Sequence, residues 1–246
     1  MTASSENTAF QAPQAAQALD SELIDRIRSS VLSLSNEEGE VFATVIVWDY
    51  TDSEVLLLTN YHTWDSYEYK YCFPPKLPAK KSTSKPKASL KRKAQQDEDE
   101  DNHVVLTLGN NDDFEHKFIV TSDVFHSWEK DEDFAVLTLP KAGFTMPRIP
   151  ISLGVSLTLK IHAFGYVGHT KQFNVSGGEI SGLLPDGFAM NLLSAGGYSG
   201  AAIIADSCGR AVGYMGENLD ASKEKNSQLQ SYGYRFDRVF HATGRQ

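Results

Sequence analysis

Short apolar segments recur along most of the chain, and turn residues separate them. The segments are rich in Val, Ile, Leu and Phe, and Gly, Pro, Asn or Asp stand between most of them. Short runs of this kind, bounded by turn residues, predict β-strands. The expected strands are 30–35, 40–49, 55–58, 104–108, 117–120, 134–139, 157–164, 173–181, 187–192, 201–205 and 211–215. Many short strands with little helical periodicity are typical of all-β barrels and sandwiches.

One helix is expected, before the first strand. Asp20 is a favourable N-cap residue, and Leu23, Ile24 and Ile27 follow it with the spacing of one apolar helix face. These signals predict a short helix over residues 20–28.

Two segments lack the apolar residues that a packed structure needs. Residues 1–19 are polar and of low complexity, and we expect them to form a flexible tail. Residues 74–103 hold eight Lys and Arg residues between Lys76 and Lys93, followed by an acidic run at 97–101. Because such a segment buries too little apolar surface to offset the entropy of ordering it, we expect a disordered charged insertion.

Two clusters of cations inside this insertion have the spacing of a two-part nuclear import signal. The cluster residues are Lys80, Lys81, Lys91, Arg92 and Lys93. Because import receptors recognise such clusters, an import receptor is one candidate partner. The alternative is a solvated loop without a targeting role.

The composition excludes several classes of protein. The 246 residues carry 23 Lys and Arg against 32 Asp and Glu, a formal charge of -9, which argues against a generic nucleic-acid binder. No apolar run reaches the ~20 residues of a membrane span, and the first residues lack the pattern of a secretory signal. We therefore expect an intracellular protein, cytoplasmic or nuclear, whose two cysteines stay reduced.

Three polar residues stand in short motifs beside apolar strands. His62 follows a strand in the segment TNYH, Asp133 leads the strand FAVLTL, and Ser199 lies in the glycine-rich turn GGYSGAA. Each motif has an ordinary structural explanation by itself. Glycines beside a serine, however, let backbone N–H groups converge next to its hydroxyl, which favours an oxyanion-binding turn. Asp131 and Glu132 are alternatives to Asp133, which we prefer because it directly leads the apolar strand.

Taken together and in this order, the motifs resemble those of the trypsin-like serine peptidases. TNYH is similar to the family's T-x-x-H block, DFAVLTL to its D-[IL]-A-[LV]-L strand, and GYSGA to its G-x-S-G-x nucleophile turn. The later segment RAVGYMG resembles the strand that lines the family's substrate site. The resemblance covers roughly residues 30–240 and is closer to the disulfide-free HtrA/Deg-like branch than to the secreted digestive enzymes.

The resemblance implies an all-β fold of two antiparallel six-stranded β-barrels, with the reacting groups in the cleft between them. Residues 20–145 are then expected to form the N-terminal helix and the first barrel. Residues 146–246 are expected to form the second barrel and a C-terminal segment.

The resemblance also implies a serine endopeptidase that acts on polypeptides without a cofactor or a metal ion. His62 would be the general base, Asp133 the residue that orients it, and Ser199 the nucleophile. The N–H groups of Gly197 and Ser199 would form the oxyanion hole. The alternative function is a catalytically silent interaction module with the same fold.

The same resemblance places the floor of the first specificity pocket about six residues before the nucleophile. The expected pocket residues are Leu193, Ser194, Gly213 and Met215. Because none of them is acidic, we expect cleavage after Leu, Met, Phe or Tyr rather than after Lys or Arg.

Overall fold

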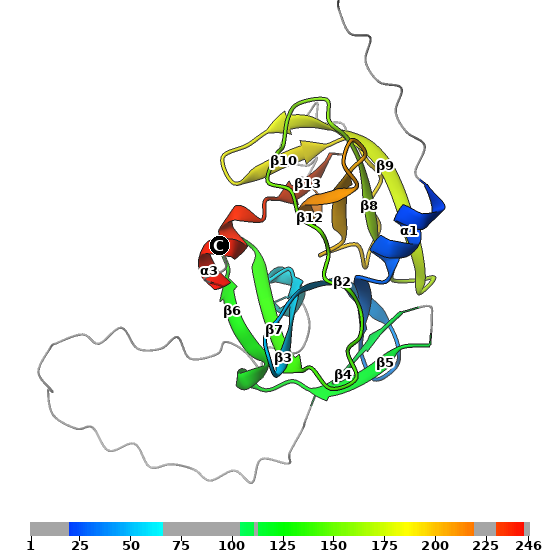
Figure 1. Cartoon of the computed structure of the whole chain (residues 1–246), viewed down its shortest axis with the longest axis vertical. Helices are drawn as coiled ribbons and strands as arrows, with labels where there is room; N and C mark the ends of the chain where they lie inside the picture. The colour runs from blue at the N-terminus through cyan, green and yellow to red at the C-terminus, as the bar shows by residue number, and fades with distance from the viewer. Residues whose placement is uncertain (1–19, 66–103, 111–112, 219–229, 244–246) are drawn as a thin grey trace, which may run out of the picture.

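Two antiparallel β-sheets, one above the other in Figure 1, make up most of the structure. The computed structural model describes residues 20–65, 104–110, 113–218 and 230–243. The expected tail at 1–19 and the whole charged insertion at 74–103, with its cation clusters, lie outside the described residues. The prediction of an all-β fold with two β units is confirmed.

The lower sheet in Figure 1 has seven strands in the order β5-β4-β1-β2-β3-β7-β6. Their bounds are Val31–Ser35 for β1, Val41–Tyr50 for β2, Glu54–Thr59 for β3, Val105–Gly109 for β4, Glu115–Ile119 for β5, Phe125–Glu129 for β6 and Phe134–Pro140 for β7. The sheet is curled but not closed, which differs from the six-stranded barrel expected for this half. The strand β5 lies at one edge of this sheet and buries a single side chain, that of Phe118. The charged residues Glu115 and Lys117 are exposed, and charged side chains on an edge strand disfavour pairing with other chains.

The upper sheet is a closed barrel of six strands in the order β10-β13-β12-β11-β8-β9, as expected. Their bounds are Lys160–Val167 for β8, Gln172–Leu183 for β9, Gly187–Met190 for β10, Ala202–Ala205 for β11, Arg210–Asn218 for β12 and Ser231–Tyr234 for β13. Closure leaves no free edge, because β9 and β13 both pair with β10.

Short helices lie at the margins of the sheets. The predicted first helix is α1, Ser21–Arg28, and the Asp20 side chain caps it by accepting a hydrogen bond from the N–H of Glu22 at 3.1 Å. The other helical segments are α2 at His62–Asp65, the 3-10 turn η2 at Ser122–Val124 and α3 at Asp237–Thr243. In the described part of the chain, none of the helices is long and apolar enough to cross a membrane.

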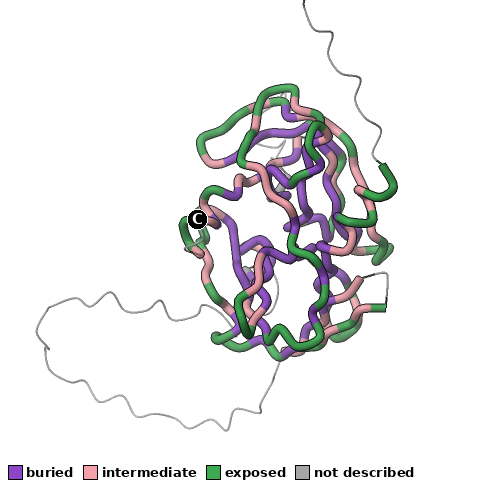
Figure 2. The backbone as a smooth tube through the Cα atoms, in the orientation of Figure 1, coloured by how far each residue is buried: buried purple, intermediate pink, exposed green. Residues whose placement is uncertain are grey.

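Strand β2 connects the two units because both of its faces are buried. Successive side chains of a strand point to opposite faces. Val45 and Val47 therefore point into the core of the first sheet, whereas Ile46 and Trp48 belong to an apolar cluster that residues of the second barrel share. Figure 2 shows buried chain running through both units and between them. We call this shared cluster the seam.

Phe236 closes the seam from the C-terminal side, and its removal should destabilise the fold. It is fully buried, with ring centroids of Trp48 at 5.3 Å and of Tyr214 at 5.8 Å. We expect Phe236→Ala to lower the free energy of unfolding by about 3–5 kcal/mol, because the lost contacts leave a cavity. The matched variant Leu157→Ala, at a side chain that is 54% exposed, should change it by less than ~0.5 kcal/mol. Urea denaturation measures both values, and a loss below ~1 kcal/mol for Phe236→Ala would contradict this packing.

Candidate active site

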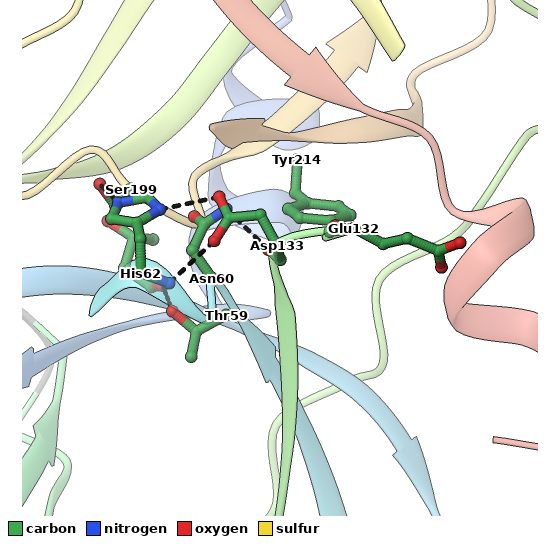
Figure 3. A network of polar contacts seen from close by, with 8 residues as sticks. Thr59, Asn60, His62, Glu132, Asp133, Ser199 and Tyr214 are labelled. Atoms are coloured by element: carbon green, nitrogen blue, oxygen red, sulfur yellow. Dashed lines mark hydrogen bonds and ion pairs between the residues drawn. The ribbon is translucent and has the colours of Figure 1, made fainter. Parts of the chain in front are cut away.

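The three motif residues come together where the two units meet, as Figure 3 shows. His62 is the first residue of α2, just after β3, and Asp133 directly precedes β7. Because β3 and β7 are antiparallel neighbours, with Thr59 opposite Ala135, the end of one strand lies beside the start of the other. Ser199 reaches them from the turn between β10 and β11 of the second barrel. Sheet pairing thus positions two of the residues, and contact between the units positions the third.

A continuous chain of hydrogen bonds links the three side chains. The distance from His62 Nδ1 to Asp133 Oδ2 is 2.7 Å, and that from His62 Nε2 to Ser199 Oγ is 2.9 Å. The backbone N–H of His62 also donates to Asp133 Oδ1 at 2.8 Å. An ionised carboxylate only accepts hydrogen bonds, so it favours the imidazole tautomer with the proton on Nδ1. That tautomer leaves Nε2 as an acceptor for the hydroxyl of Ser199.

Asn60 supplies a third donor to the Asp133 carboxylate. Its Nδ2 donates to Asp133 Oδ2 at 2.9 Å and to the Asp133 backbone carbonyl at 3.2 Å. The Asn60 side chain is fully buried, and Figure 3 shows it beside the carboxylate. The sequence motif TNYH contains Asn60, but motif spacing gave no reason to assign it a role. A polar amide directly between an apolar strand and a histidine is the sequence signal that could have identified it.

Asp133 is the one acid of its cluster whose side chain contacts His62 in the described structure. Its backbone has φ +47°, in the left-handed region, which aspartate tolerates better than most residues. The neighbouring Glu132 turns away, and its side chain pairs with Arg238 while its carbonyl accepts from the Tyr214 hydroxyl at 3.3 Å. Asp131 is exposed. The unusual backbone conformation therefore lets one of three adjacent acids point inward.

The glycine-rich turn orients two backbone N–H groups beside Ser199. Gly197 has φ +93°, and a Cβ atom there would lie 2.6 Å from the backbone nitrogen of Gly168. The carbonyl of Gly196 accepts from that same nitrogen at 2.7 Å. In a trans peptide the N–H points opposite to the C=O, so the Gly197 N–H points away from Gly168. Within the described ranges, neither the Gly197 nor the Ser199 N–H donates to another residue, and both are available to a bound oxyanion.

Tyr198, between these two N–H groups, is anchored in the interior of the second barrel. Its hydroxyl donates to Asn174 Oδ1 at 3.2 Å, and burial raises the pKa of the Tyr198 phenol to about 12. The phenol therefore stays neutral at physiological pH.

The four expected pocket residues have different surroundings. Gly213 and Met215 are buried, Ser194 is half-buried, and the side chain of Leu193 is 84% exposed. Met215 is tied to the Ser199 turn, because its carbonyl accepts from the Gly200 N–H at 2.9 Å and its N–H donates to Ala201 at 2.8 Å. Met215 is therefore fixed relative to Ser199, whereas the assignment of all four residues to a substrate pocket stays a prediction. Elsewhere in the described ranges, no three His, Cys, Asp or Glu side chains gather as metal ligands do.

Comparison with solved structures shows what the chain is similar to. It matches the structure of Deg5 with a TM-score of 0.59 and 13% identity, over 89% of this chain and 90% of that one. It matches the inactive form of the Rv3671c protease with a TM-score of 0.56 and 12% identity, over 91% of each chain. An inactive serine-to-alanine mutant of Rv3671c from M. tuberculosis H37Rv matches with a TM-score of 0.56 and 13% identity, over 90% and 88%.

The protein has a trypsin-like fold of the HtrA/Deg type. No known protein family and no curated protein matches the sequence itself. Likeness at this level of identity shows the fold alone.

The hydrogen-bond donors to the Asp133 carboxylate should contribute measurably to the free energy of unfolding. We expect Asn60→Ala to lower the free energy of unfolding by about 1–3 kcal/mol, because it removes a donor from a buried carboxylate. Asn174→Ala, which removes an acceptor of the Tyr198 hydroxyl on an exposed residue, should cost less, about 0.5–1.5 kcal/mol. Urea denaturation of both variants gives the comparison. An Asn60→Ala variant as stable as the parent protein would show that the amide contributes nothing to the carboxylate.

Proposed function

We propose that the protein is a serine endopeptidase that hydrolyses peptide bonds through an acyl-enzyme. The observation that carries this proposal is the chain of contacts from Asp133 through His62 to Ser199, with distances of 2.7 and 2.9 Å. A serine hydroxyl is a weak nucleophile at neutral pH and needs a base within hydrogen-bond reach. His62 Nε2 has that position.

In the acylation step, Ser199 Oγ attacks the carbonyl carbon of the substrate while its proton moves to His62 Nε2. The resulting imidazolium lies beside the Asp133 carboxylate, which stabilises its charge and keeps the ring oriented. The tetrahedral intermediate then collapses, the C–N bond breaks, and His62 donates the proton to the leaving amine. The acyl group remains on Ser199.

In the deacylation step, a water molecule takes the place of the amine. His62 accepts a proton from the water as the water attacks the ester, and returns it to Ser199 Oγ as the ester bond breaks. The carboxylic acid product leaves and the starting state is restored.

The negative charge that develops on the substrate oxygen in both steps needs donors. The N–H groups of Gly197 and Ser199 fit this role, because neither is used by another residue in the described structure. Removal of one such donor in comparable enzymes costs about 10²–10³-fold in kcat. A catalytically silent module would gain nothing from two unused donors beside an aligned serine, which favours the enzyme over that alternative.

For the substrate, we propose a preference for apolar residues on the acyl side of the cleaved bond. Met215 offers a flexible apolar wall, and no acid is among the expected pocket residues. A buried lysine or arginine of the substrate would lack a carboxylate partner, at a cost of several kcal/mol.

The proposed nucleophile is tested with a fluorophosphonate probe, which reacts with activated serines whatever the natural substrate. Ser199→Ala should abolish labelling, and His62→Ala should reduce its rate by orders of magnitude. His62→Ala should also lower the free energy of unfolding by about 1–3 kcal/mol, because it removes a donor from the buried Asp133 carboxylate. Ser127→Ala is the matched control, since Ser127 Oγ has no hydrogen-bond partner in the described structure, and it should label normally. Full labelling of Ser199→Ala or His62→Ala would overturn the assignment.

The proposed specificity is tested with a peptide library whose cleavage products are sequenced. Cleavage should occur after Leu, Met, Phe or Tyr, because the expected pocket has no charge to pair with a cation. Dominant cleavage after Lys or Arg would show that a carboxylate from another segment reaches the pocket, and would overturn the apolar assignment.

A further inference from the structure

We propose that Thr44 is a positioning residue for the oxyanion hole. By holding the Gly197 carbonyl, its hydroxyl keeps the Gly197 backbone in the conformation in which the Gly197 N–H binds the developing charge. This inference rests on the proposed peptidase function. It concerns a residue of β2 in the first sheet that acts on a turn of the second barrel.

The Thr44 hydroxyl connects the two units with a pair of hydrogen bonds. Its Oγ1 donates to the carbonyl of Gly197 at 2.8 Å and accepts from the backbone N–H of Tyr166, in β8, at 2.9 Å. The side chain is fully buried. The backbone N–H of Thr44 donates to the carbonyl of Ser199 at 2.8 Å. One residue thus binds the carbonyls of both residues whose N–H groups face the oxyanion.

These bonds fix the conformation of a dipeptide that is otherwise very flexible. Gly196 and Gly197 carry no Cβ, so their peptide planes rotate at low energetic cost. The carbonyl of Gly196 is held by Gly168, and the carbonyl of Gly197 is held by Thr44. With the peptide planes on both sides of Gly197 fixed, its φ of +93° and the direction of its N–H are fixed too.

The position of Thr44 in the strand indicates that the hydroxyl has a specific role. Successive side chains of β2 point to opposite faces, so Thr44 lies on the same face as Ile46 and Trp48. These two residues contribute apolar side chains to the seam. A hydroxyl buried on such a face is costly unless it is hydrogen-bonded. Strand β8 of the second barrel leaves space for this hydroxyl, because a Cβ atom on Gly165 in β8 would lie 3.0 Å from Thr44 Oγ1.

The first experiment observes the Gly197 N–H directly and needs no activity. The chain contains two Gly-Gly pairs, 177–178 and 196–197. Protein labelled with ¹³C at the glycine carbonyl and ¹⁵N at the glycine amide therefore gives two signals in an HNCO spectrum, from Gly178 and Gly197. Thr44→Val, which removes the hydroxyl at nearly constant shape, should shift or broaden the Gly197 signal and leave the Gly178 signal in place.

Two further variants make this result specific to the hydroxyl. Thr44→Ser keeps the hydroxyl and should retain the parent Gly197 signal. If Thr44→Val does not fold, Thr44→Cys replaces it with the same expectation, because a thiol is a weak donor. A Gly197 signal that is unchanged in the variant without the hydroxyl would overturn the proposal.

The second experiment measures whether this positioning matters for the reaction. Thr44→Val should lower kcat and the rate constant of fluorophosphonate labelling by about 10- to 100-fold, with KM changed by no more than about 2-fold, since a displaced donor affects the transition state more than the bound substrate. Thr44→Ser should restore most of the rate. Thr138→Val is the matched control, because Thr138 Oγ1 in β7 has no partner in the described structure, and it should leave the rate unchanged.

The outcomes separate this inference from the proposed function. If the parent protein is not labelled at all, the proposed peptidase function is wrong, while the Gly197 signal still decides whether Thr44 positions the turn. If the parent protein is labelled and Thr44→Val reacts at the parent rate, Thr44 has no part in the oxyanion hole.

Discussion

A backbone hydrogen bond from the Thr44 N–H to the Ser199 carbonyl, 2.8 Å long, joins the first sheet to the turn that carries Ser199, and the site depends on it. His62 and Asp133 belong to the first sheet, whereas Ser199 belongs to the second barrel. Apolar packing in the seam holds the units together but has no direction. A hydrogen bond has a preferred length and angle, so this contact determines the distance between His62 and Ser199 more closely than the seam does.

The Asp133 carboxylate imposes a second constraint, because it is almost removed from water. Its side chain is 9% exposed, and such a charge is costly unless donors surround it. The backbone N–H and the ring of His62 provide two donors, and the amide of Asn60 provides the third. These donors converge because Asp133 adopts a left-handed backbone conformation at the start of β7. A polar network satisfied in this way is rigid, and it keeps the His62 ring oriented with Nε2 2.9 Å from Ser199 Oγ.

The apolar core of this fold can be built from very different sequences. Structures with 12–13% identity to this chain share its fold over about nine-tenths of its length. Cores accept many combinations of apolar residues, provided that their volume and pattern are kept. The side-chain hydrogen bonds to Asp133 leave less freedom, since each needs a particular donor and acceptor.

The sequence by itself determined the elements whose signals are local. The Asp20 cap and the apolar face behind it predicted α1, and short apolar runs predicted most of the strands. Strands β6 and β13 and helix α3 were missed, because segments such as SYGY, Ser231–Tyr234, carry little apolar alternation of their own. The motifs also gave the positions of His62, Asp133 and Ser199, which the structure brings into contact.

Only the tertiary structure decided which distant residues meet. It showed that the first sheet stays open, that Leu193 is exposed, and that Asn60 and Thr44 contact the site. Thr44 and Gly197 are 153 residues apart in the chain. Local periodicity tells which face of a strand is apolar, but the partner of a buried polar group depends on how the sheets pair and pack, and residues far apart in the sequence determine that.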